Sequence, residues 1–141
     1  MGKKEKAPVK TVLDTNILVS AILFKGELAR LVDLWEGRKI VPVVSRETFD
    51  EFRAVLGYPK FRLTKGEIKA IIEEILPFFE VVETDKAVSG ICKDPDDDKF
   101  ITCAIAAAAD FIITGDNDLC DVASYRSVRI IRASALLKMF E

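Results

Sequence analysis

Histidine is absent from the 141 residues of this chain. Its absence excludes Ser–His and Cys–His nucleophilic pairs, histidine general bases and the usual zinc ligands. The three cysteines, Cys92, Cys103 and Cys120, form no CxxC pair, which argues against a zinc site or a disulfide framework and predicts small buried hydrophobes. Any catalytic chemistry must therefore depend on carboxylates.

Long apolar runs are also missing. No run approaches the ~20 residues that span a bilayer, and the N-terminus lacks the apolar core of a signal peptide. We therefore expect a cytoplasmic protein that has no membrane partner. The length suits one domain, which we assign to residues 10–141, with residues 1–9 as a Lys-rich, disordered arm.

The acidic residues are unevenly distributed. Eight aspartates fall in three places, and excluding them changes the formal net charge from −2 to +6. They are Asp14, then Asp94, Asp96, Asp97 and Asp98, and finally Asp116, Asp118 and Asp121. A cation bound among them would leave a surface positive enough to attract phosphates, so nucleic-acid binding is plausible despite a pI near 5.3.

Apolar runs and helical periodicity alternate along the chain. The runs predict strands at residues 10–14, 40–44, 80–83, 111–114 and 128–131. The periodic segments predict helices before Gly26 and at residues 27–36, 46–56, 65–79, 94–109 and 119–123, with a last helix capped by Ser134. Further cap signals are Ser45, Gly37 and the capping box of Thr64 with Glu67.

The strands are continuous apolar runs, which is typical of a sheet covered on both faces. Together with the alternation of strands and helices, this predicts an α/β fold. We expect a three-layer α/β/α sandwich with a central parallel sheet and Rossmann-like topology.

Asp14 and Asp116 each follow an apolar strand, so both are expected at the carboxyl edge of the sheet, where open α/β sheets bind ligands. The acidic run at residues 94–98 opens a helix that should start at the same edge. Carboxylates packed together repel one another unless a cation neutralises them. Hard divalent ions prefer all-oxygen ligands, so Mg²⁺ or Mn²⁺ is the expected cofactor.

Each of these acids also has an ordinary structural explanation. Asp14 could only cap a helix, the acids at 94–98 could complement a helix dipole, and Asp116 and Asp118 could be turn formers. Glu51, in the middle of a helix, could lie on a solvated surface. Their joint arrangement favours a site.

The motifs occur in a characteristic order. They are Val12-Leu13-Asp14-Thr15-Asn16, then Ser45 to Glu51 ahead of Val55-Leu56, then Asp94-Pro95-Asp96-Asp97-Asp98-Lys99-Phe100, and finally Thr114-Gly115-Asp116 with Asp118-Leu119. In this order the chain after its arm resembles PIN domains, particularly the VapC-like ribonuclease toxins of toxin–antitoxin systems.

The resemblance implies a catalytic set of Asp14, Glu51, Asp97 and Asp116, with the metal held by Asp14, Asp97, Asp116 and Asp118. Asn16 and Thr114 would be supporting groups. Asp94 and Asp98 are the alternates for the third acid. Related sequences commonly have Asn where Asp98 stands, and helical spacing puts Asp97 on the face of Ile101, so Asp97 ranks before Asp94 and Asp94 before Asp98.

The implied reaction is hydrolysis of RNA phosphodiester bonds by metal-activated water. The same resemblance implies a homodimer and an antitoxin partner. Candidate phosphate contacts are Arg46, Arg53, Lys60, Arg62 and Lys65, although an ordinary solvated face explains them equally well.

Three other functions compete with this interpretation. A phosphatase that forms an aspartyl phosphate would need a second Asp where Asn16 stands. A nucleotide-binding Rossmann module would need a Gly-rich loop after the first strand. A non-catalytic PIN-like scaffold that binds RNA or protein stays open, because a fold does not establish an activity.

Overall fold

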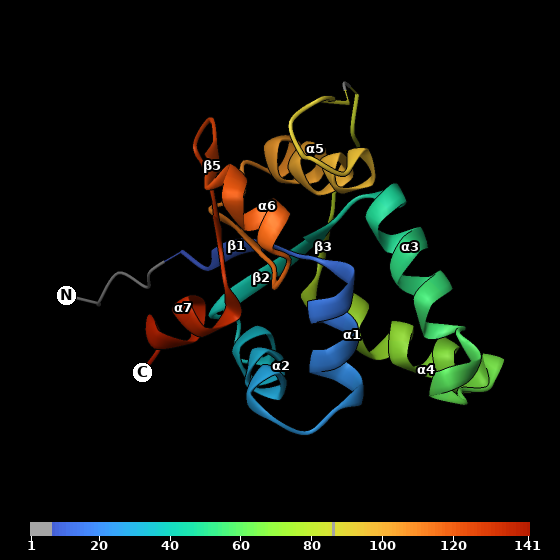
Figure 1. Cartoon of the computed structure of the whole chain (residues 1–141). Coiled ribbons are helices and arrows are strands. Elements are labelled where there is room, and N and C mark those ends of the chain that lie inside the picture. Colours follow the sequence, from blue (N-terminus) through green and yellow to red (C-terminus); the bar gives the residue numbers. More distant parts are fainter. Residues whose placement is uncertain (1–6, 86) are drawn as a thin grey trace.

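The computed structural model describes residues 7–85 and 87–141, and its described strands form one sheet in the order β3-β2-β1-β4-β6-β5 (Figure 1). The strands are β1 (Val9–Leu13), β2 (Ile40–Val44), β3 (Glu80–Val81), β4 (Phe111–Ile113), β5 (Ser124–Tyr125) and β6 (Val128–Ile131). Strand β1 is central, between β2 and β4. Strands β2 and β3 extend the sheet on one side of β1, and β4, β6 and β5 extend it on the other.

Every pairing in this sheet is parallel except that of β5 with β6. The expected parallel sheet is therefore confirmed with one addition, a short antiparallel edge strand. Sequence patterning missed β5 because two residues are too few to show periodicity. The turn of this hairpin includes Arg126, whose φ of 54° is left-handed.

Among the described residues, seven α-helices connect and cover the strands. They are α1 (Thr15–Leu23), α2 (Arg30–Glu36), α3 (Arg46–Leu56), α4 (Lys65–Ile75), α5 (Asp98–Ala107), α6 (Asn117–Val122) and α7 (Ala133–Lys138). Short 3₁₀ turns, η1 (Glu27–Ala29), η2 (Pro59–Phe61), η3 (Leu76–Phe78) and η4 (Pro95–Asp97), precede or follow them.

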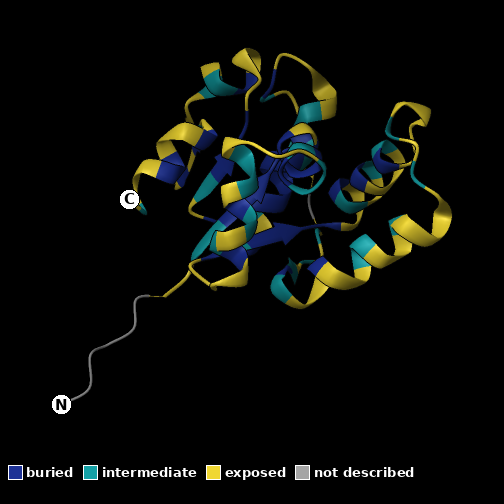
Figure 2. Cartoon of the chain, turned by 90° about the horizontal axis from the view of Figure 1, so that it is seen from below, coloured by how far each residue is buried: buried dark blue, intermediate teal, exposed yellow. Residues whose placement is uncertain are grey.

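Alternate residues of the central strands point to opposite faces of the sheet and pack into two separate hydrophobic cores. In β1, Leu13 packs with residues of α1, α2, α3 and α7, whereas Val12 packs with residues of α5 and α6. The same alternation separates Ile113 from Ile112 in β4. Figure 2 shows this pattern as buried strands between layers whose outer faces are exposed. The three-layer α/β/α architecture is therefore confirmed.

Two of the predicted helix starts are confirmed in detail. The hydroxyl of Ser45 accepts a hydrogen bond from the Thr48 backbone, and Thr64 forms a capping box with Glu67. These caps satisfy backbone N–H groups that have no partner within the helix. Together they set the positions at which α3 and α4 begin.

Several predicted boundaries were wrong. Helix α4 ends at Ile75, not at Phe79, because Pro77 has no N–H to donate. The last helix is not capped by Ser134: it begins at Ala133 after Arg132, without a side-chain cap, so Ser134 lies inside it. The strand predicted at residues 80–83 covers only Glu80–Val81.

The helix predicted at residues 94–109 was also placed inaccurately. It starts as the 3₁₀ turn η4, becomes α-helical at Asp98 and ends at Ala107, where Ala108 takes a left-handed φ of 51°. At the N-terminus, strand β1 already begins at Val9, within the arm predicted at residues 1–9. The rest of that prediction lies mostly outside the described residues.

Candidate active site

The candidate site lies at the edge of the sheet between β1 and β4, where the order of the strands reverses. Strands β1 and β4 are neighbours, yet the segments that follow them belong to opposite halves of the fold. Asp14 follows β1 and Asp116 follows β4 after two residues. Parallel strands bring their carboxyl ends to one edge, so these two acids, distant in sequence, meet at the switch point.

Asp14 is held firmly at this edge. One carboxylate oxygen accepts a hydrogen bond of 2.8 Å from the Ile17 backbone, which makes Asp14 the N-cap of α1, and the other accepts one from the Thr114 hydroxyl. Burial raises the pKa of Asp14, the hydrogen bond from Thr114 opposes this, and the charge of Asp116 adds to it. The capping and functional explanations of Asp14 are thus compatible.

Thr114 connects the two acids. Its side chain is fully buried, and its hydroxyl oxygen also accepts a hydrogen bond of 3.0 Å from the Asp116 backbone. Asp116 in turn caps α6 by accepting a hydrogen bond of 3.0 Å from Leu119. The supporting position expected of Thr114 is therefore occupied by a residue that orients both carboxylates.

Asp97 lies at the end of η4 and lines the same cleft as Asp14 and Asp116. Burial, followed by the negative charge of Asp116, raises the pKa of Asp97 to about 6. Weaker repulsion comes from the carboxylates of Asp94, Asp14 and Asp96. The acids of three chain segments thus interact at one place.

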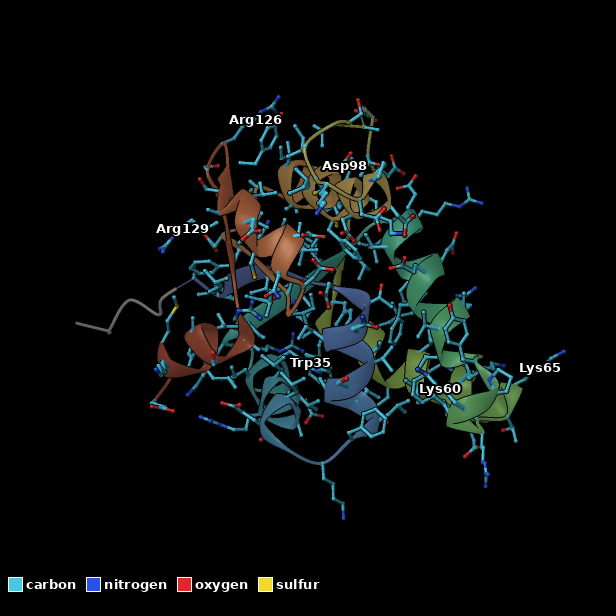
Figure 3. All side chains as sticks on the ribbon, viewed as in Figure 1. Trp35, Lys60, Lys65, Asp98, Arg126 and Arg129 are labelled. Atoms are coloured by element: carbon cyan, nitrogen blue, oxygen red, sulfur yellow. The ribbon has the colours of Figure 1, made fainter. Side chains whose placement is uncertain are left out.

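The two alternates to Asp97 have structural roles. Asp98 is buried, and its oxygens accept hydrogen bonds of 3.0 Å from Gly90 and 2.8 Å from Cys92, so it holds the loop before η4 against α5 (Figure 3). Asp94 caps η4 by accepting a hydrogen bond from Asp96. Only Asp97 of the three lines the cleft.

Glu51 lies on α3 and points into the cleft, not onto a solvated surface. One of its oxygens accepts a hydrogen bond from the Thr15 hydroxyl, and the other lies 2.6 Å from the ammonium of Lys99. Lys99 also lies 3.1 Å from Asp96. Sequence reasoning assigned no role to Thr15 or Lys99, although both stand within the quoted motifs, beside Asp14 and after Asp98.

The cleft has a volume of about 960 Å³ and two chemically different ends. Its polar end is lined by Asp14, Asn16, Glu51, Asp97 and Asp116. Its other end is lined mainly by apolar and aromatic side chains, namely Leu23, Phe24, Leu28, Val55, Tyr58, Phe61 and Leu63, together with Lys60. A volume of this size is at the upper end of small-molecule sites.

Two expected site residues differ in placement. Asn16 is exposed and lines the cleft. Asp118 does not line it: its side chain is 48% exposed and lies 3.9 Å from Lys93. Arg132 is a further residue that the sequence did not reveal, since it donates a hydrogen bond of 3.1 Å to the Gly115 carbonyl beside Asp116.

The sequence model of the PIN domain matches residues 10–118. The chain belongs to the PIN-domain family. Proteins of this family are generally nucleases. An uncharacterized protein of Methanocaldococcus jannaschii is 34% identical over 122 residues, which are 84% of this chain and 78% of that protein.

Solved structures share the PIN fold at low sequence identity. VapBC2 from Rickettsia felis, bound to a DNA fragment from its promoter, has a TM-score of 0.59 at 14% identity and covers 86% of this chain and 97% of that one. FitAcB from Neisseria gonorrhoeae has a TM-score of 0.56 at 18% identity, with coverage of 86% and 96%. These likenesses establish the fold alone.

The residues of this PIN domain fit a hard divalent cation in their chemistry. All of the donors in the polar end of the cleft are oxygens, and burial, followed by repulsion from the neighbouring carboxylates, raises the pKa of Asp97. Within the described residues, no three acidic or cysteine side chains are already arranged as a closed metal site.

The cysteines take no part in this site. Burial raises the pKa of Cys92 to about 12 and that of Cys103 to about 11, so both thiols stay protonated at neutral pH. Cys120 is only partly buried, which differs from the expectation that all three cysteines are buried.

Among the described residues, no helix is long and apolar enough to cross a membrane.

Proposed function

We propose that this PIN domain is a metal-dependent ribonuclease that hydrolyses RNA phosphodiester bonds, and that it acts as a VapC-like toxin in the cytoplasm. The observation that carries the proposal is the meeting of Asp14, Asp97 and Asp116, from three separate segments, in one cleft. Repulsion of this kind costs stability unless a cation is bound. A site that retains it is therefore best explained by metal-dependent catalysis.

Asp14, Asp97 and Asp116 would hold Mg²⁺ or Mn²⁺, and Asp118 would have to turn inward to join them. The bound ion would lower the pKa of a water molecule and offset the charge on the leaving oxygen. Thr114 fixes Asp14 and Asp116 relative to each other, because its hydroxyl bonds to the carboxylate of Asp14 and to the backbone of Asp116. Glu51, fixed by Thr15 and Lys99, faces the cleft and would orient the attacking water.

The proposal includes a partner protein and self-association. The order of the motifs and the likeness in fold to VapBC2 and FitAcB support an antitoxin that blocks this cleft, and a homodimer as the active form. The antitoxin is tested by co-purification of the chain with the product of a neighbouring gene. The homodimer is tested by measuring the mass of the chain in solution.

A cleavage assay tests the catalytic part. The purified chain is incubated with labelled single-stranded and hairpin RNAs and Mn²⁺ or Mg²⁺, alongside EDTA and the variants Asp14→Asn and Asp94→Asn. We expect cutting that EDTA and Asp14→Asn abolish and that Asp94→Asn leaves close to the original rate, because Asp94 does not line the cleft.

Titration of the protein with Mn²⁺, combined with the cleavage assay, distinguishes the remaining outcomes. Cutting that persists in Asp14→Asn would disprove the site assignment. A folded protein that neither cuts RNA nor binds Mn²⁺ would favour the alternative, a non-catalytic PIN-like scaffold that binds RNA or protein. Binding of Mn²⁺ without cutting of any RNA in the panel would contradict a general ribonuclease and require a narrow substrate.

A further inference from the structure

The apolar end of the cleft exposes aromatic side chains that the proposed chemistry does not use. Phe24 is 54% exposed and Tyr58 is 49% exposed. The ring of Phe61 lies beside that of Phe24, with centroids 6.1 Å apart. Contiguous exposed apolar surface of this kind usually marks a binding site.

A turn rich in cations adjoins these rings. Residues 53–66 contain Arg53, Lys60, Arg62 and Lys65 and no acid. All four side chains belong to exposed residues, and none forms an ion pair with any described residue. Figure 3 shows Lys65 pointing into solvent at the outer end of the hairpin of α3 and α4.

The cations on either side of this turn behave differently. Arg46 pairs with Asp50 at 3.9 Å, and Lys69 pairs with Glu73 at 3.9 Å. The turn itself is therefore a local concentration of uncompensated positive charge. A polyanion is the complementary partner, and a strand of nucleic acid supplies both negative charge and flat bases.

Helix α1 connects the carboxylates to the aromatic end. Asp14 caps its start and Phe24 follows its last residue, so the two are separated by about 15 Å along the helix axis. A nucleotide strand rises about 3.4 Å per residue when stacked and more when extended, so about two to four nucleotides cover this span.

We propose that Phe24, Tyr58 and Phe61 form a stacking site for unpaired bases of the RNA substrate, about two to four nucleotides from the scissile phosphate. Lys60 and Arg62 contact the backbone phosphates of the same nucleotides. The inference rests on the proposed ribonuclease function, because that function places a phosphate at the carboxylates. It makes single-stranded RNA, not a duplex, the substrate class.

Fluorescence anisotropy tests the stacking site. Short labelled oligo(A) and oligo(U) are bound by the full chain carrying Asp14→Asn, which prevents cleavage. Adding Tyr58→Ala or Phe24→Ala should weaken binding by roughly fivefold or more, and Tyr58→Phe should restore it because the ring is kept. The control Met139→Ala removes a side chain that is 51% exposed on another face and should change nothing.

The contribution of charge is measured separately. Lys60→Ala should reduce the slope of log affinity against log salt concentration by about 0.7, because one phosphate contact is lost. Lys138→Ala, an exposed lysine of α7 that does not line the cleft, should leave the slope unchanged.

Abasic RNAs locate the stacked base. When the base that contacts Tyr58 is missing, Tyr58→Ala should cost no further affinity, whereas abasic sites elsewhere should leave the full effect. Unchanged affinity in both aromatic variants would overturn the proposal and assign the apolar end to a protein segment. Equal losses at every abasic position would overturn it too.

The two proposals fail in distinguishable ways. If the parent chain does not cut RNA, the ribonuclease function is disproved. If it cuts RNA at the same rate and with the same KM in Phe24→Ala and Tyr58→Ala, the ribonuclease function holds and the stacking site is disproved. Melting temperatures of the variants check that each is folded.

Discussion

Lys99 is the residue whose role depends most on its surroundings. Its side chain is 18% exposed and its ammonium lies between Glu51 and Asp96. Burial acts to lower the pKa of Lys99, but these two bonds outweigh it and raise the pKa, so the ammonium stays charged. It therefore holds Glu51 at the wall of the cleft as a positioning residue.

We predict that Lys99→Met lowers the kcat of RNA cleavage by roughly tenfold or more, because an unsupported Glu51 loses its orientation. KM should change little, and Lys99→Arg should recover part of the rate. The control is Lys69→Met, whose lysine is exposed on α4 and pairs with Glu73 at 3.9 Å away from the cleft. An equal loss in both variants would contradict the specific role of Lys99.

A second prediction concerns the carboxylate of Asp97. Its folded-state pKa of about 6 is above the ordinary value of 3.8, so its ionisation destabilises the metal-free fold progressively as pH rises through this range. Asp97→Asn should therefore stabilise the EDTA-treated protein at pH 7 by roughly 1 kcal/mol, after allowance for solvent screening. This corresponds to a melting temperature about 3 °C higher.

The same variant should lose most of its affinity for Mn²⁺. Thermal melts with EDTA and with Mn²⁺, at pH 5 and pH 7, measure both effects in one series. A metal-free melting temperature that falls in Asp97→Asn would show that its carboxylate makes a stabilising bond, contrary to the repulsion seen here.

The segment before α5 depends on one buried side chain. Asp98 accepts hydrogen bonds from the backbones of Gly90 and Cys92, and the Thr102 hydroxyl oxygen accepts one of 3.1 Å from the Val88 N–H. These contacts fix the loop that leads into η4 and hence the position of Asp97. Asp98 therefore stabilises the loop that positions Asp97.

We predict that Asp98→Ala destabilises the protein by about 1–3 kcal/mol, because two backbone donors lose their acceptor. Asp94→Ala, which removes only an exposed cap, should cost about 1 kcal/mol or less. Urea unfolding measures both. If Asp98→Ala keeps its stability but loses Mn²⁺ binding, Asp98 is a ligand and the structural role is wrong.

At the scale of the whole molecule, charge is separated along the cleft. Carboxylates occupy one end, and Lys60 lines the other end beside the cationic segment of residues 53–66, while the net charge is only −2. An RNA strand that spans both ends meets repulsion from the carboxylates unless a cation is present.

We therefore predict that Mn²⁺ strengthens RNA binding beyond the effect of monovalent salt at equal ionic strength. In EDTA, Asp14→Asn should bind RNA more tightly than the parent chain, since one repulsive charge is gone. Anisotropy titrations in both conditions compare the two proteins. Equal affinities in EDTA would show that the scissile phosphate does not approach Asp14.

The sequence by itself determined the order of strands and helices, the starts of α3 and α4, and the candidate acids Asp14, Asp97 and Asp116. These follow from local chemistry: apolar periodicity, capping side chains and motif order lie within a few residues of one another. The same local view could not detect β5, whose two residues pair with β6, nor the start of α7 at Ala133, which has no side-chain cap.

Only the tertiary structure decided which carboxylates share the cleft and which hold the fold. Asp97 and Asp98 are adjacent in sequence, yet one lines the cleft and the other binds backbone N–H groups. The partner of Glu51, Lys99, is 48 residues away, and Thr114 is 100 residues from Asp14. Such contacts depend on how the strands cross in the sheet, which no local pattern encodes.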